Sequence, residues 1–272
     1  MIELDLNSLL VGLSDPSTLN GNDLHLRHVS LLISQADTCN KKTDDSHYER
    51  AHNKDSHFSF LSANPTQQQL FSNQDQLNSW KSSLPIIDAT PDKIPFHSGW
   101  IGYFAYPSKH SIAEFNYYPW TICLDHHTDT FHLLGKPDSA AKKAFAWLLQ
   151  AQADLLLINT SRKVQLSEIP IVNEALVNHA AFKATPFKAK WDKAEYQEAF
   201  NKVQSYLLAG DCYQVNLTQP YISEQYTGSP ASTLLPLLKA LRPSFGCYFQ
   251  GQNCELVSVS PERFISINSQ GK

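Results

Sequence analysis

The order of predicted elements between residues 121 and 156 decides the fold class. TICLDHHTDTFHLL, residues 121–134, is typical of two short strands around a polar turn at residues 125–129. SAAKKAFAWLLQAQADLL, residues 139–156, is rich in Ala and Leu, which favour a helix. Strands followed by a helix indicate separate α and β segments rather than alternating βαβ units. We therefore predict an α+β fold with mostly antiparallel sheets and packed helices.

Two further strands are predicted upstream. LRHVSLLIS, residues 26–34, is rich in Leu and β-branched residues, and SHFSFLSANP, residues 56–65, alternates until a proline ends it. We expect these strands to pair across residues 35–55, which contain no aliphatic residue larger than Ala. FHSGWIGYFAY, residues 96–106, places two glycines inside an aromatic run, which indicates a bulge or a close backbone approach.

The composition is that of a soluble globular protein. Of the 272 residues, 42% are hydrophobic and 18% are charged, and the chain is long enough to build a core without disulfides. The formal net charge of −4 gives no electrostatic reason for a nucleic acid or an anionic membrane as partner, so we expect neither. No stretch approaches the roughly 20 apolar residues of a membrane-spanning helix.

Cysteine usage and the N-terminus indicate a reducing compartment. The five cysteines are scattered and contain no C-x-x-C pair, so we expect neither a disulfide framework nor a zinc site. The first residues carry acids instead of the basic region of a signal peptide. We therefore expect a cytoplasmic location.

A second helix is predicted in WDKAEYQEAFNKVQSYLLAGD, residues 191–211. Asp192 can cap the first turn, with Glu195 three residues later in a variant of the capping box, and Gly210 stands where a helix would end. Four apolar residues at i, i+4, i+7 and i+11 share one face: Tyr196, Phe200, Val203 and Leu207.

This helix also suggests a domain division. The residues before it are irregular, with two prolines and several lysines. We predict a first domain at residues 1–170, a linker at 171–187 and a second domain at 188–272.

DCYQVNLTQPY, residues 211–221, alternates with a period of two and is predicted to be a strand with one apolar and one amide-rich face. Two interpretations of Gln214 and Asn216 stay open. They belong to a half-exposed antiparallel strand, or they line a polar cleft in which amides orient a small ligand.

Several catalytic motifs are missing from the sequence. The eleven histidines form no H-x-x-x-H or H-E-x-x-H pattern, so a metal site built from them is not expected. No G-x-G-x-x-G, Walker-type loop or G-x-S-x-G elbow occurs, which argues against a nucleotide-binding enzyme and a hydrolase triad.

ELVSVSPERF, residues 255–264, is an alternating strand ended by Pro261, which places Glu262 and Arg263 at the strand exit. In one interpretation these two residues are a solvated surface pair. In the other, Glu262 is a general acid or base whose pKa is raised toward neutrality by burial. Spacing alone does not decide between them.

Three motifs together resemble the chorismate-utilising enzymes. They are Y-x-x-x-x-x-x-V-Q-x-Y-L-x-x-G-D-C-Y-Q-V-N-L at residues 196–217, R-P-S-F at 242–245 and S-V-S-P-E-R-F at 258–264. The Cys-Tyr pair and the Asn of the first motif look more like the aminodeoxychorismate synthase component I branch than the anthranilate synthase component I branch. The implied fold is α+β and anthranilate synthase component I-like.

The resemblance implies a chorismate aminase. Such an enzyme converts chorismate and ammonia to 4-amino-4-deoxychorismate for p-aminobenzoate and folate synthesis, with Mg²⁺ as cofactor and a glutamine amidotransferase subunit as the source of ammonia. By resemblance, Glu262 is the catalytic acid that protonates the departing 4-hydroxyl of chorismate, a step to which a positioned acid contributes about 10²–10⁴-fold.

Other parts of the family site are expected beyond Lys272. They are the nucleophilic lysine of a P-I-K-G-T segment, the glutamates that hold Mg²⁺ and a Gly-rich segment for the substrate carboxylate. We therefore expect an incomplete second domain, no metal ligand within this chain and no activity of the isolated 272 residues.

The first half resembles the family's N-terminal domain in L-L-I-S at 31–34, S-H-F at 56–58 and G-W-I-G-Y-F-A-Y at 99–106. In some members that domain helps to hold a tryptophan, so tryptophan is a possible ligand. The matching positions are Ser34, Asp55, Ser56, His57, Phe58, Ser244, Phe245 and Gly246.

Two alternatives remain beside the aminodeoxychorismate synthase interpretation. Within the family, the alternative is anthranilate synthase component I. From a different class, the alternative is a non-catalytic module that binds tryptophan or docks an amidotransferase.

Overall fold

The computed structural model describes residues 26–34, 58–85, 94–106, 112–161, 181–241 and 243–267. The chain forms two compact units. Unit 1 consists of Met1–His179 together with Pro230–Lys272, and unit 2 is Ala180–Ser229. None of the helices in the described residues is long and apolar enough to cross a membrane.

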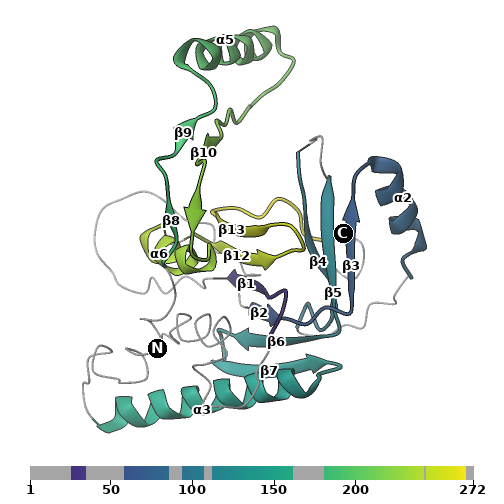
Figure 1. Ribbon diagram of the computed structural model, residues 1–272, viewed down its shortest axis with the longest axis vertical. Helices are drawn as coiled ribbons and strands as arrows, with labels where there is room; N and C mark the ends of the chain where they lie inside the picture. Colours follow the sequence, from purple (N-terminus) through teal and green to yellow (C-terminus); the bar gives the residue numbers. More distant parts are fainter. Residues whose placement is uncertain are drawn as a thin grey trace. The chain divides into compact units, whose positions relative to one another are not determined.

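A six-stranded antiparallel sheet forms the centre of unit 1, in the order β13-β12-β1-β2-β6-β7 (Figure 1). Leu32 of one strand faces Phe60 of the next, so the predicted pairing of these two segments is confirmed. The predicted hairpin around residues 125–129 is also confirmed. The strands are β1 (Ser30–Ser34), β2 (Phe58–Ser62), β6 (Trp120–Asp125), β7 (Thr130–Gly135), β12 (Phe245–Gln250) and β13 (Glu255–Ser260).

A three-stranded antiparallel sheet lies in the same unit, in the order β3-β5-β4. Its strands are β3 (Gln67–Phe71), β4 (Gly99–Phe104) and β5 (Ala113–Tyr118), and α2 (Gln74–Ser83) follows β3. Asn73 caps α2 by accepting from the backbone N–H of Gln76 at 3.0 Å. A Cβ on Gly102 would collide with the backbone oxygen of Glu114, so the predicted close backbone approach in this segment is confirmed.

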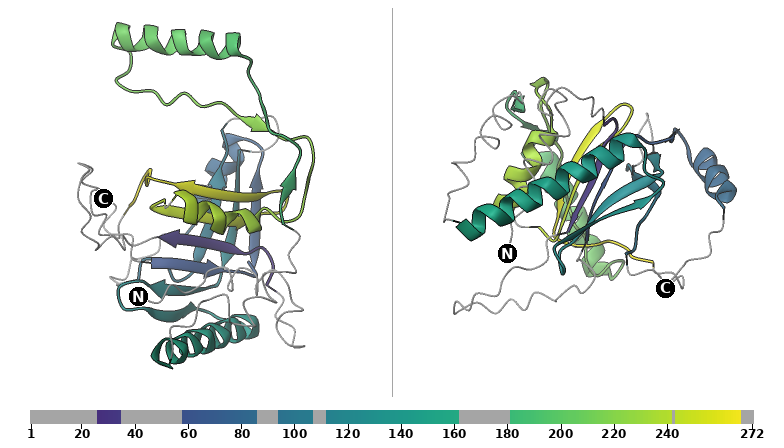
Figure 2. Two further views of the ribbon diagram at one scale, coloured as in Figure 1. Left: turned by 90° about the vertical axis from the view of Figure 1, so that its left-hand side faces the viewer. Right: turned by 90° about the horizontal axis from the view of Figure 1, so that it is seen from below.

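The two faces of the six-stranded sheet are both covered. On one face, Leu31 and Ile33 pack with residues of α3 (Ser139–Ser161) and α6 (Ala231–Leu241). On the other face, Leu32 and Phe249 pack with Ile101 of the small sheet. Figures 1 and 2 show α3 running along one side of this sheet. The α+β prediction with mostly antiparallel sheets and packed helices is therefore confirmed.

The sheet joins strands from both predicted domains. Ser34 of β1 faces Phe245 of β12, although the prediction assigns these residues to domains 1–170 and 188–272. Unit 2 starts within the predicted linker, residues 171–187, and ends within the predicted second domain, residues 188–272. Residues far apart in the chain therefore complete one sheet.

Unit 2 consists of a two-stranded ribbon and a helix. Strand β8 (Lys183–Ala184) pairs with β11 (Tyr226–Thr227), and β9 (Lys188–Ala189) pairs with β10 (Tyr221–Ile222). The helix is α5 (Lys193–Ala209). Its predicted caps are confirmed, because Asp192 and Glu195 form the capping box and Gly210 has φ 78° in the left-handed region.

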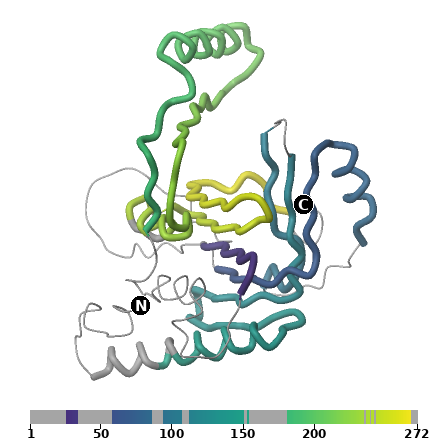
Figure 3. The backbone as a smooth tube through the Cα atoms, viewed as in Figure 1, coloured from purple at the N-terminus to yellow at the C-terminus, as the bar shows by residue number. Residues whose placement is uncertain are grey.

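The predicted strand at residues 211–221 is wrong over most of its length. Only Tyr221 and Ile222 form a ladder, and residues 211–220 form none. Figure 3 shows this part of the chain passing from α5 toward β10. A strand needs a neighbour for its backbone N–H and C=O groups, and no described segment pairs with residues 211–220.

Candidate functional site

The exit of β13 places Glu262 at the surface. Its side chain is exposed, as are those of Pro261 and Phe264. The Ser260 hydroxyl fixes the turn, because it donates to the carbonyl of Glu262 at 2.9 Å and accepts from the Glu262 N–H at 3.4 Å. The described residues therefore hold the backbone of Glu262 but do not bury its carboxylate.

Arg263 connects this turn to the neighbouring strand. Its guanidinium carbon lies 4.9 Å from the centroid of the Phe245 ring, within the range of a cation–π contact. Arg263 is half-buried, unlike its neighbours Glu262 and Phe264. The predicted surface pair is therefore unequal, with an exposed acid beside a base that packs on an aromatic ring.

Residues predicted to bind tryptophan meet at one end of the six-stranded sheet. Ser34 in β1 faces Phe245 in β12. Leu32 of β1 faces Phe60 of β2, and the two strands are antiparallel. Phe58 precedes Phe60 by two residues, and Ser34 follows Leu32 by two. Strands β1 and β12, distant in sequence, thus bring Ser34 and Phe245 side by side, and Phe58 begins β2, the other neighbour of β1.

Aromatic rings continue inward from this end of the sheet. The Phe58 and Phe60 centroids are 6.2 Å apart, and Phe60 meets Phe96 edge to face at 5.9 Å. Phe58, Phe60 and Phe245 are all half-buried. A planar apolar ligand would find matching surface on such rings.

Ser244 and Gly246 are the other described positions that were predicted to bind tryptophan. Ser244 is half-buried next to Phe245, whereas a Cβ on Gly246 would lie 2.6 Å from the Leu238 side chain in α6. The absence of a side chain at Gly246 therefore serves the packing of α6. Asp55, Ser56 and His57 lie outside the described residues.

The amides predicted to line a polar cleft are both exposed. Gln214 and Asn216 lie in the segment of unit 2 that forms no ladder, and the intervening Val215 is 41% exposed. Residues 211–220 belong to no helix or strand, so no regular backbone orients the two amides toward a common side. In the described part of the chain both amides are therefore open to solvent, and their role in a polar cleft stays a prediction.

A row of buried polar residues in β5 was not predicted from the sequence. Glu114, Asn116 and Tyr118 are fully buried, although they stand at alternate positions on a short strand. The Glu114 carboxylate accepts from the N–H of Gln252, and the Tyr103 hydroxyl donates to it at 3.4 Å. The sequence AEFNYY shows polar residues with a period of two. This pattern does not show that they are buried, which depends on their hydrogen-bond partners elsewhere in the chain.

The rest of this row links the two sheets of unit 1. Asn116 donates to the carbonyl of Gln250 at 3.3 Å, and Tyr118 donates to the carbonyl of His28 at 2.7 Å. Burial raises the pKa of Tyr118, with a smaller opposing effect from Asn116, so its hydroxyl stays protonated and able to donate. These bonds hold the small sheet against the β12–β13 turn.

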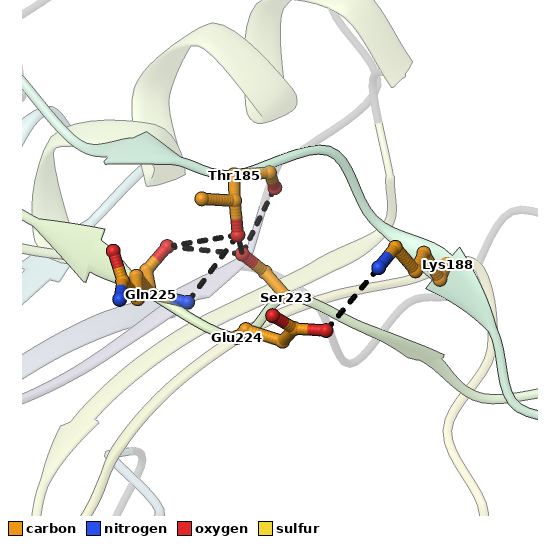
Figure 4. Close-up of polar contacts among 5 residues, drawn as sticks. All are labelled: Thr185, Lys188, Ser223, Glu224 and Gln225. Atoms are coloured by element: carbon orange, nitrogen blue, oxygen red, sulfur yellow. Dashed lines mark hydrogen bonds and ion pairs between the residues drawn. The ribbon is translucent and has the colours of Figure 1, made fainter.

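A hydroxyl cluster joins the two strand pairs of unit 2 (Figure 4). The Ser223 and Thr185 hydroxyls lie 2.8 Å apart, and Ser223 also donates to the carbonyl of Gln225 at 3.0 Å. Lys188 and Glu224 form an exposed ion pair at 3.2 Å. The cluster fills the gap between β8–β11 and β9–β10, so its role is to join the ribbon.

The described residues do not fit a Mg²⁺ site. Among them, no group of three or more His, Cys, Asp or Glu residues is placed to hold a metal ion. Mg²⁺ demands a near-octahedral set of oxygen ligands, of which one or two carboxylates usually come from the protein.

Comparison with known proteins places this fold. Anthranilate synthase component I from Streptococcus pneumoniae TIGR4 superposes with a TM-score of 0.53 at 17% identity, over 84% of this chain and 55% of that one. The architecture is therefore the anthranilate synthase component I fold. The sequence model of the chorismate binding enzyme family matches residues 30–272, so the chain belongs to this family.

Curated relatives support the same family. Aminodeoxychorismate synthase component 1 of Escherichia coli is 28% identical over 64% of this chain and 36% of its own length. The protein of that name from Klebsiella aerogenes is 30% identical over 55% of this chain and 28% of its own. An anthranilate synthase component I-like protein of Synechocystis is 22% identical over 75% and 41%. In these three matches the chain thus spans between 28% and 41% of the relatives' lengths.

Proposed function

We propose that this chain is part of an aminodeoxychorismate synthase component I, which aminates chorismate to 4-amino-4-deoxychorismate. The observation that carries the proposal is the family match over residues 30–272, which includes the exit of β13. Relatives named aminodeoxychorismate synthase component 1, at 25–30% identity, support this branch, as does the Cys-Tyr and Asn pattern at residues 212–216.

In this proposal Glu262 donates a proton to the 4-hydroxyl of chorismate as it leaves. The Ser260 hydroxyl and the packing of Arg263 on Phe245 hold the turn that carries the acid. A general acid works when it is within hydrogen-bond reach of the leaving oxygen and its pKa is near the working pH. Because Glu262 is exposed among the described residues, substrate or further protein must cover it to supply that environment.

The nucleophile and the cofactor belong to the same proposal. No P-I-K-G-T segment occurs in residues 1–272, so the lysine would come from further sequence. We propose the same source for the Mg²⁺ ligands, since the described residues do not fit that ion. No step of the mechanism assigned to this chain involves the metal. Ammonia would come from a glutamine amidotransferase subunit.

Tryptophan is proposed as a second ligand of unit 1. Its indole would stack among Phe58, Phe60 and Phe245 at the sheet end where Ser34 lies. Titration calorimetry with tryptophan tests this ligand. Phe245→Ala should abolish the heat of binding, and Phe104→Ala, which removes an exposed ring of β4, is the matched control.

Two other functions have specific support. Relatives named anthranilate synthase, such as component 1 of Bacillus pumilus at 26% identity, favour that product. The exposure of Glu262 favours a non-catalytic module that binds tryptophan or docks an amidotransferase.

One assay separates these functions. The protein from the complete reading frame that encodes residues 1–272 is incubated with chorismate, ammonium and Mg²⁺, and the products are separated by chromatography. We expect 4-amino-4-deoxychorismate. Anthranilate would select the alternative enzyme, and the absence of both products would favour the non-catalytic module.

The role of Glu262 is tested in the same assay. We expect Glu262→Gln to lower the rate of product formation about 10²–10⁴-fold, because an amide cannot deliver the proton. Glu198→Gln, on the exposed surface of α5, is the matched control and should keep the rate. An unchanged rate for Glu262→Gln would remove Glu262 from the mechanism.

A further inference from the structure

Arg263 is the one side chain of the segment after β13 that is not exposed. Residues 261–267 are all described, and the other six are exposed. The Arg263 guanidinium carbon lies 4.9 Å from the centroid of the Phe245 ring, within the range of a cation–π contact. Because a guanidinium is planar, it can stack on an aromatic ring and keep a long side chain in one place. The chain that leaves β13 is therefore anchored at Arg263.

The ring that receives Arg263 is itself held inside the sheet. Phe245 pairs on both sides, with Ser34 of β1 and with Ser260 of β13. Ser260 is also the residue whose hydroxyl binds the N–H and the carbonyl of Glu262. The backbone of Glu262 is therefore held from both directions, by Ser260 before it and by Arg263 after it. Both contacts begin at residues that face each other across β12 and β13.

The direction of the Glu262 carboxylate depends on this backbone. The side chain is exposed, and the two hydrogen bonds to Ser260 are made by the Glu262 main chain. A general acid has to lie within hydrogen-bond reach of the leaving oxygen. Residues that fix the acid from outside the reaction are what give it that precision. Any group that holds the turn thus controls where the proton is delivered.

We propose that Arg263 is a positioning residue for the proton donor Glu262. By stacking on Phe245 it fixes the turn and directs the carboxylate toward the departing 4-hydroxyl of chorismate, an inference that rests on the proposed amination. Arg263 acts through Glu262 and does not bind chorismate, because its guanidinium packs on the ring. Its substitution should therefore lower kcat and leave KM unchanged, since the substrate loses no contact.

Steady-state kinetics test this role on the protein from the complete reading frame, with chorismate, ammonium and Mg²⁺. We expect Arg263→Met to lower kcat about 10- to 100-fold, because a misplacement of about 1 Å can cost 10²-fold. Arg263→Lys keeps a cation near the ring and should lose less. Arg27→Met, at an exposed arginine of unit 1, is the matched control and should keep kcat. A raised KM with unchanged kcat for Arg263→Met would assign Arg263 to substrate binding and overturn the proposal.

Double substitutions show whether Arg263 acts through the acid and the ring. Arg263→Met should lower kcat no further in a Glu262→Gln background, which has no proton to direct, or in a Phe245→Leu background, which has no ring. Phe245→Tyr keeps the ring and should keep the full effect of Arg263→Met. A general loss of structure would lower kcat by the same factor in every background, so equal factors would contradict a positioning role.

Hydrogen exchange follows the turn without catalysis. Peptides from residues 259–266 should exchange at least about threefold faster in Arg263→Met and in Phe245→Leu than in the wild-type protein, because a less constrained turn opens more often. Peptides from β6 should not change, which verifies that the variants are folded. Unchanged exchange in the turn would show that Arg263 does not hold it. Absence of product from the wild-type protein would instead overturn the proposed amination, and the exchange result would still decide whether Arg263 holds the turn.

Discussion

Gly102 in β4 lies close to the backbone of β5, the neighbouring strand of the small sheet. An added Cβ would collide with the backbone oxygen of Glu114 and lie 2.6 Å from the Phe115 ring. Backbone of a paired strand cannot move aside as a flexible side chain can. We therefore expect Gly102→Ala to lower the free energy of unfolding by about 1–3 kcal/mol, the usual cost of overpacking.

Urea unfolding followed by tryptophan fluorescence measures this loss. Gly210→Ala is an informative control, because a Cβ there meets nothing within 4 Å and the cost arises only from its φ of 78°. That cost should be about 1–2 kcal/mol. Equal stability of Gly102→Ala and the wild-type chain would contradict the close approach of β4 and β5.

Cys123 in β6 makes stability depend on pH. Burial raises the pKa of this thiol from its ordinary 9.0 to about 12, with a smaller effect from Asp125. Above pH 9 the unfolded chain releases the thiol proton while the folded chain keeps it, so folding loses stability as pH rises. Below pH 9 both states are protonated and this contribution is complete.

We therefore expect the wild-type chain to lose unfolding free energy between pH 9 and 11 faster than Cys123→Ala, by at most about 1.4 kcal/mol per pH unit. Urea unfolding at a series of pH values measures both slopes. Other groups titrate in this range, so only the difference between the two slopes reports on Cys123. Parallel slopes would mean that the thiol ionises equally in both states.

At the scale of elements, α5 is held by its caps. It contributes no buried residue to unit 2, so local interactions carry much of its stability. The Asp192 carboxylate accepts from the N–H of Glu195 at 2.9 Å. Asp192→Ala should therefore destabilise the helix by about 1 kcal/mol, the typical value of an N-cap. Amide exchange in the first turns of α5 measures this change.

A second substitution in the same helix controls for a simple loss of charge. Glu198→Ala removes an exposed carboxylate of α5 that takes no part in the capping box. It should alter exchange by much less than Asp192→Ala. If the two variants behaved alike, the cap would not be what holds the helix.

Elements specified by neighbouring residues were predictable, and elements that depend on distant partners were not. The β6–β7 hairpin and the caps of α5 follow from local patterns, and both are confirmed. Residues 211–220 have an equally clear pattern, but no described strand pairs with them. Alternation shows which residues can share a face, whereas a ladder also needs a second strand.

The candidate site, too, depends partly on contacts between residues that are distant in sequence. The resemblance selected Ser34 and Phe245, but their adjacency depends on a strand pair that spans more than 200 residues of sequence. The burial of Glu114 was not predictable either, because a carboxylate is buried only when donors such as the Gln252 N–H meet it. Its position in β5 gives no sign of the turn it contacts.

At the scale of the whole molecule, the two units differ in how much of their apolar surface is covered. Unit 1 buries large residues such as Trp120, Leu148 and Leu234 between its sheets and helices. In unit 2, α5 buries none of its residues, and Tyr221 and Ile222 of the ribbon are also exposed. Because burial of apolar surface is the main stabilising contribution to folding, the free energy of unfolding should be smaller for unit 2.

We therefore expect two separate transitions when the chain is unfolded in increasing urea. Amides of α5 should lose protection at a lower urea concentration than amides of β1 and β6, because they open without exposing a buried core. Hydrogen exchange at each urea concentration resolves the two sets of peptides. Leu234→Ala, which leaves a cavity in unit 1, should lower the second midpoint and leave the first unchanged. A single midpoint shared by both sets, shifted as one by Leu234→Ala, would mean that the two units unfold together.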